Sequence, residues 1–232
     1  MYMAIDALTW TIINPLLKKG KLPNIQKLIK SGVSLTLASE QPLLTPIVWT
    51  SIFSGQKASK HGVTGFFDWY DDVKCPRIWD ILNLEKKYSI GLFKVPVTEN
   101  PPYNLNGFVV PAEHVLGQRS TRPPEYKFIE EMLHGKVHLK PKNIKEKILK
   151  YMSEFSASFE SLRYGLKIKT VVEFLAYILW RKLFARHKNT ENVYWRSFLK
   201  RKIYFESFNN LMSEFKPDFS VIYIAEADHF GH

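Results

Sequence analysis

Short apolar runs alternate with amphipathic segments over the first 135 residues. Runs at 1–5, 89–95 and 108–110 have the length of buried strands, and 33–37 alternates polar and apolar residues like a further strand. The spacing of apolar residues predicts helices over these ranges: 9–19, divided into two turns near Pro15, 23–30, 46–54 and 78–84. Strands that alternate with helices predict an α/β fold, with a mostly parallel sheet flanked by helices.

A long helical pattern follows, over residues 136–212, with no proline after Pro141. It ends before Pro217, and residues 219–225 form an apolar, partly β-branched run typical of a strand. The sequence therefore predicts three parts, which are the first part of an α/β core (1–135), a helical insertion (136–212) and a return strand of the core (213–232).

The helical region carries the net charge of the chain. The whole sequence of 232 residues has a formal charge of +11, and residues 136–205 hold 17 Lys and Arg against 5 Asp and Glu. Such a basic region fits nucleic acid, an anionic surface or a polyanionic substrate. The simpler interpretation of the same charges is a solvated helical face.

Composition excludes several classes of protein. With 45% hydrophobic residues and abundant aromatics, the chain can bury a large core and is not disordered. It has no run of 18 apolar residues, so no transmembrane segment is expected. No signal peptide is recognisable, and the single Cys75 excludes an internal disulfide framework and a cysteine zinc site. These features favour a cytoplasmic location and make Cys75 an inert thiol.

The segment from Leu43 to Gly55 has the pattern of a loop followed by a helix that ends before Gly55. Pro46 suits the first helical position, which makes Thr45 the expected N-cap, and Gly55 suits the left-handed residue after the helix. A hydroxyl at this place is usually a plain cap. It is also where a phosphate can be held and a nucleophile activated.

Potential metal ligands follow the predicted strands. Asp6 comes directly after the first strand, and Asp228 and His232 lie just past the last one. Ligands of open α/β sheets collect at the carboxyl edge of the strands, and Asp and His suit zinc. Asp6 as a helix cap and His61 as a structural residue in its His-Gly turn are the ordinary alternatives.

These motifs together resemble the alkaline phosphatase superfamily, and within it the type I phosphodiesterase/nucleotide pyrophosphatase family. The resemblance covers residues 1–125 and 215–232 and leaves out the basic helices. It rests on the following segments: Ile5-Asp6, Leu44-Thr45-Pro46 with Gly55, Lys60-His61-Gly62, Phe93 to Thr98, and Tyr223 to His232.

The resemblance implies an alkaline-phosphatase-like sheet and a hydrolase for phosphate-ester small molecules. Two divalent metal ions, zinc by the nature of the family, would bind Asp6 and Thr45 in one site and Asp228 and His232 in the other. Thr45 would be the catalytic nucleophile. The family uses a further Asp-His pair and another His, so the sequence is expected to be a partial, inactive member. Ala7 stands where the family usually has Gly.

Other functions were weighed against this one. A sulfatase needs a Cys-x-Pro-x-Arg-like nucleophile motif, which Thr45-Pro46-Ile47 does not supply. A phosphoglycerate mutase-like or phosphopentomutase-like member matches less well. From a different class, the chain could be a non-catalytic anion- or nucleic-acid-binding module that uses its basic helices.

Overall fold

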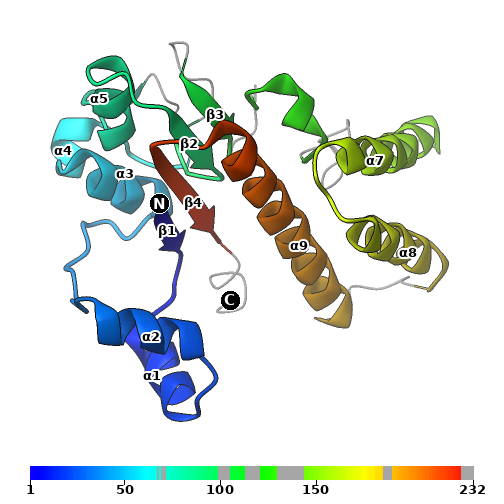
Figure 1. Cartoon of the computed structure of the whole chain (residues 1–232), viewed down its shortest axis with the longest axis horizontal. Helices are drawn as coiled ribbons and strands as arrows, with labels where there is room; N and C mark the ends of the chain where they lie inside the picture. The colour runs from blue at the N-terminus through cyan, green and yellow to red at the C-terminus, as the bar shows by residue number, and fades with distance from the viewer. Residues whose placement is uncertain are drawn as a thin grey trace.

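The computed structural model describes residues 1–66, 68, 72–98, 105–112, 121–129, 144–184 and 190–225. Within them, four strands form one parallel sheet in the order β1-β4-β2-β3 (Figure 1). The strands are β1 (Tyr2–Ile5), β2 (Ile90–Phe93), β3 (Gly107–Val110) and β4 (Phe219–Ile224). This confirms the predicted α/β fold with a mostly parallel sheet. The last strand of the sequence lies between the first two.

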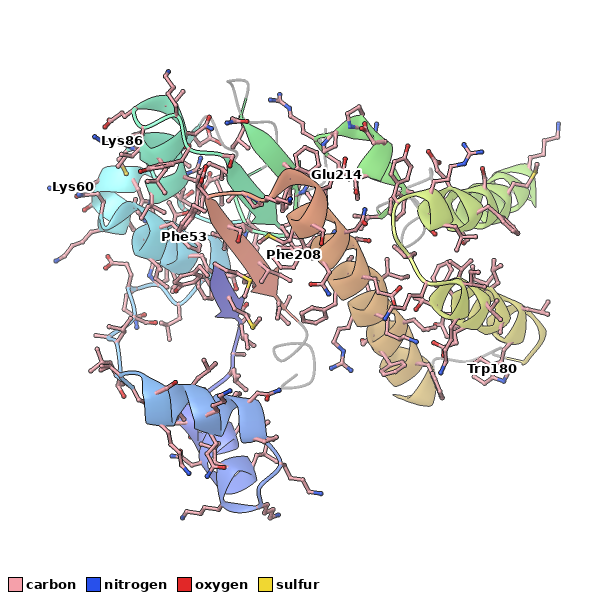
Figure 2. The ribbon with its side chains drawn as sticks, viewed as in Figure 1. Phe53, Lys60, Lys86, Trp180, Phe208 and Glu214 are labelled. Atoms are coloured by element: carbon pink, nitrogen blue, oxygen red, sulfur yellow. The ribbon has the colours of Figure 1, made fainter. Side chains whose placement is uncertain are left out.

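Each face of the sheet is covered by a different set of helices. Successive strand residues point to opposite faces, so Leu92 and Val221 join one apolar cluster while Phe93 and Ile222 join another. The first cluster includes Phe53 of α3 (Thr45–Ser54), beside α4 (Ala58–His61) and α5 (Ile78–Leu84). The second is covered by α9 (Thr190–Phe215). Figure 2 labels Phe53 and Phe208 on the two sides of the sheet.

Long helices occupy the described part of the basic region. They are α7 (Ile144–Arg163), α8 (Ile168–Phe184) and α9. Of these, α9 packs on β2 and β3, and its side chains Phe208 and Leu211 are buried in the sheet's core. The chain reaches them through the 3-10 helix η2 (Pro124–Lys127), where the Tyr126 hydroxyl donates to Glu214 at 2.7 Å. The division of the sequence into core and insertion stays a prediction. Helix α9, which lies in the predicted insertion, packs on the sheet and contributes to its core.

The N-terminal helices α1 (Trp10–Lys18) and α2 (Pro23–Ser31) form a hairpin that stands away from the sheet (Figure 1). The expected division of the first helix near Pro15 is wrong, because one continuous helix accommodates Pro15 in its interior. The predicted strand at 33–37 is also wrong. No strand in the described residues pairs with this segment. Its apolar side chains Val33, Leu35 and Leu37 are at least 72% exposed.

Of the helices that the structure describes, none is both long and apolar enough to span a bilayer.

Candidate active site

Asp6 lies at the carboxyl edge of the sheet, where β1 and β4 end side by side. Ile5 pairs with Ile224, and the next amide, that of Asp6, donates to the Ile224 carbonyl at 2.9 Å. This bond extends the ladder by one residue and holds the backbone of Asp6 at the edge. The half-buried carboxylate is thereby placed beyond the strands, as expected from the sequence.

Thr45 lies opposite Asp6, at the start of α3. Its hydroxyl donates to Asp6 Oδ2 at 3.1 Å, across 39 residues of sequence. The expected N-cap role is wrong, because Leu44 is the N-cap, Thr45 is already helical and its side chain bonds no backbone amide at the helix start. The hydroxyl is directed to the carboxylate instead. The end of the helix is as predicted, with Gly55 left-handed at φ 65°.

Tyr223 is the site residue that the sequence did not reveal. Its hydroxyl donates to the same Asp6 Oδ2 at 2.5 Å, and its ring meets Trp49 edge-on with centroids 5.6 Å apart. Trp49 is one turn after Thr45 on α3, so Tyr223 contacts both the carboxylate and the helix that carries the hydroxyl. Nothing in the apolar run 219–225 distinguished this tyrosine from a core residue.

The Asp6 carboxylate and the Thr45 hydroxyl, which the fold brings together, suit a divalent cation. Within the described part of the chain, both hydrogen bonds to the carboxylate fall on Oδ2, which leaves Oδ1 of Asp6 as an acceptor beside the Thr45 oxygen. Such hard oxygen donors fit zinc or magnesium. Asp228 and His232 lie outside the described residues, and among the described ones no three His, Cys, Asp or Glu side chains gather around a metal position.

Ala7, which follows Asp6, adopts a left-handed backbone with φ 53°. That conformation costs a residue with a Cβ about 1–2 kcal/mol, and only glycine adopts it freely. The strain lies next to the site carboxylate, where it sets the direction in which the chain leaves β1.

Ala7→Gly should therefore stabilise the chain by about 1 kcal/mol, after the greater entropy of unfolded glycine is subtracted. The measurement is the midpoint of urea unfolding. Ala176→Gly, at an exposed position in the middle of α8, is the matched control and should destabilise the chain by about 0.5–1 kcal/mol. Destabilisation by both changes would show that Ala7 is not strained.

His61 has the structural role that its turn suggested. It is fully buried, its Nδ1 accepts the Val63 amide at 3.1 Å, and its Nε2 lies 2.9 Å from Ser51 Oγ. Since Nδ1 accepts, Nε2 carries the proton and donates to the Ser51 hydroxyl. Burial lowers the pKa of His61, and nearby Glu40 and the Ile47 carbonyl offset this only in part. His61 thus ties the loop after α3 back onto that helix as a neutral ring.

The free energy of unfolding should consequently fall as the pH drops below about 6.5. Unfolded His61 binds a proton near that pH, whereas folded His61 binds one only at a lower pH, so acid favours the unfolded chain. Urea unfolding at pH 7.5 and pH 5.5 measures the difference. His61→Gln should be less stable at pH 7.5 but should lose less between the two pH values. An equal loss in both chains would exclude His61 as the cause.

Comparison with known proteins decides the family. The family model for type I phosphodiesterase / nucleotide pyrophosphatase matches residues 2–232. The chain belongs to this family. The match runs through the basic helices, which the resemblance read from the sequence had left out, and this agrees with the packing of α9 on the sheet. Neither the curated proteins nor the solved structures gave a match to this chain. As a family member, the chain is a hydrolase of the phosphodiesterase/pyrophosphatase type, and its sheet is consistent with an alkaline-phosphatase-like fold.

Proposed function

We propose that this chain is built to hydrolyse phosphodiesters with Thr45 as the nucleophile and two zinc ions as cofactors. The observation that carries the proposal is the 3.1 Å hydrogen bond from the Thr45 hydroxyl to Asp6 Oδ2. A hydroxyl that only capped its helix would bond an amide of the first turn. Here it bonds a carboxylate from a distant strand, in a family that cleaves phosphate esters.

The roles of the protein groups follow from this contact. Thr45 Oγ forms the bond to phosphorus as the bond to the leaving oxygen breaks; the hydroxyl proton is lost to solvent water, and the leaving oxygen takes up a proton from solvent. The Asp6 carboxylate orients the hydroxyl through their hydrogen bond. Tyr223 keeps the carboxylate in place by donating to the same oxygen. The start of α3, with its positive end of the helix dipole, favours the negative phosphoryl oxygens. Water then cleaves the phosphothreonine and restores the hydroxyl.

Zinc would be held by Asp6 and Thr45 in one site and by Asp228 and His232 in the other. The metals supply charge neutralisation and a lower pKa for the attacking hydroxyl. By this assignment residues 1–232 give two protein ligands per metal, fewer than the three usual in catalytic zinc sites. Zinc affinity and turnover of this chain should therefore be low, and its assays need zinc in excess.

Equilibrium dialysis against zinc tests the metal assignment. The wild-type chain should take up zinc, and Asp6→Asn should remove one site, because the amide is a far poorer ligand than the carboxylate. Asp218→Asn is the matched control, since Asp218 is an exposed carboxylate that directly precedes β4 and so lies at the opposite edge of the sheet. Equal zinc uptake by wild type and Asp6→Asn would contradict the proposal.

A second candidate function is a non-catalytic anion-binding module. The excess of 17 basic over 5 acidic residues in 136–205 favours it. Such a module needs no zinc, so a chain that binds polyanions but takes up no zinc, and hydrolyses no nitrophenyl phosphodiester with zinc in excess, would support it over the hydrolase.

A further inference from the structure

Helix α8 turns an apolar stripe toward solvent. Four residues at helical spacing make up this face, and all of them are exposed: Ile168, Val172, Ala176 and Leu179. The exposed fraction reaches 72% at Ile168, 58% at Val172 and 57% at Leu179. The opposite face, with Val171 and Phe174, is the one buried in the core. A soluble helix usually shows polar residues on its outer face, so this stripe marks an interaction surface.

The stripe runs into an aromatic groove between α8 and α9. The groove has a volume of about 430 Å³ and is lined by Glu173, Ala176, Tyr177, Trp180, Trp195 and Leu199. Trp180 and Trp195 stay 39% and 57% exposed at its mouth. Glu173, the carboxylate among these residues, is bonded by Lys202 at 2.5 Å, so the groove offers no unbalanced negative charge.

The described part of α9 beside the groove is basic, with Lys200, Arg201 and Lys202 directly after the lining residue Leu199. From Trp180 to Lys202 the sequence holds eight Lys and Arg against the single acidic residue Glu191. Half-exposed tryptophans beside an apolar helical face and a cluster of basic residues are the combination that proteins use at the surface of an anionic bilayer. Since α8 cannot span a membrane, it would lie along the surface.

We propose that the α8–α9 end of the molecule docks on an anionic lipid bilayer. The aliphatic stripe enters the apolar boundary, the two tryptophans sit at the level of the headgroups, and the basic residues meet the lipid phosphates. Single-stranded nucleic acid also binds aromatic and basic groups, by stacking and charge. Nucleic acid offers no apolar partner to the aliphatic side chains Ile168, Val172 and Leu179, whereas the interior of a bilayer does. The docking surface is independent of the proposed zinc site.

Sedimentation with lipid vesicles tests the proposal. The full chain should pellet with vesicles that contain 30% phosphatidylglycerol and should bind phosphatidylcholine vesicles at least about tenfold more weakly. Its tryptophan emission should shift to shorter wavelength when it binds. Failure to bind the anionic vesicles, or equal binding to both kinds, would overturn the proposal. So would tighter binding to single-stranded DNA, or a dimer that Trp180→Ala and Trp195→Ala disrupt.

Matched double variants separate the apolar and the electrostatic parts. Trp180→Ala with Trp195→Ala should weaken vesicle binding by at least about tenfold, as should Lys169→Gln with Lys200→Gln. The controls are Leu28→Ala with Leu35→Ala and Lys60→Gln with Lys86→Gln, which should change binding less than about twofold. Figure 2 shows Lys60 and Lys86 at the end of the molecule opposite Trp180. Controls that weaken binding as much as the test pairs would overturn the assigned surface. Far-UV circular dichroism checks that each variant is folded, and the lysine pair tests the surface even where the tryptophan pair misfolds.

Discussion

Thr45→Ala should lower the weak zinc-dependent hydrolysis of bis(4-nitrophenyl) phosphate to the rate measured without protein. The change removes the oxygen that attacks phosphorus, and no other described hydroxyl is bonded to Asp6 except that of Tyr223, which belongs to a far less mobile ring in the strand. Turnover is measured with zinc in excess, in this chain and in any longer form of it.

Thr45→Ser sharpens the test because it keeps the oxygen. Serine lacks the methyl group that restricts threonine's χ1, so the hydroxyl is less well aligned with Asp6 Oδ2, and activity should fall only about tenfold. The serine variant should also form a covalent phosphoserine that mass spectrometry detects. Thr36→Ala, at an exposed threonine between α2 and α3, is the control and should leave turnover unchanged. Full activity in Thr45→Ala would assign the nucleophile elsewhere.

Asp80→Ala should cost the fold about 3–5 kcal/mol, which is a large fraction of the stability of a typical domain. Asp80 Oδ2 accepts both the Arg77 amide at 2.8 Å and Arg77 Nε at 3.2 Å. Arg77 is only 1% exposed and lies over the Trp79 ring, 5.0 Å from its centroid. Removal of the carboxylate takes away the acceptor of the Arg77 amide and the negative charge that the buried Arg77 Nε contacts. Denaturant unfolding measures the loss.

A double-mutant cycle isolates that interaction. Arg77→Met in the Asp80→Ala background removes the buried guanidinium that has lost this contact and should recover part of the lost stability. Glu173→Gln is the matched control, because its pair with Lys202 is partly exposed and should be worth less than about 1 kcal/mol. If Asp80→Ala costs no more than Glu173→Gln, the buried pair does not hold α5 to the loop before it.

The meeting of Asp6 and Thr45 could be predicted from the sequence, but only the place of Asp6 follows from a general rule. Parallel strands end at a common edge, which places Asp6 directly after β1. The place of Thr45 beside it was predicted by the family resemblance, because the strand expected at 33–37 does not form. The contact of Tyr223 could not be predicted, because a tyrosine in an apolar strand is normally a core residue and its hydroxyl carries no sequence signal. The N-cap assignment of Thr45 failed by one position, since Leu44 is the extended residue before the helix and Thr45 is already its first helical residue.

The helices of the basic region were predictable from their periodicity, but their packing was not. Apolar spacing shows that a helix has one face to bury, not what it is buried against. Only the structure shows that Phe208 and Leu211 of α9 cover the sheet while Val172 and Leu179 of α8 face solvent. In the same way, alternation at 33–37 indicates a strand only where a neighbouring strand is present to share its hydrogen bonds.

Because β4 pairs with β1, this part of the sheet cannot form until synthesis has reached β4. The bond between Asp6 and Tyr223 joins residues 217 apart in sequence. A ribosome that adds roughly 5–20 residues per second needs about 10–40 s between the two, and β1 has no strand neighbour among the described residues until β4 arrives. A nascent chain therefore carries the apolar strand β1 without its partner β4 while the residues between them are made. Chaperones that bind exposed strands can act in this interval, and the site carboxylate gains its bond from Tyr223 only after β4 has been made.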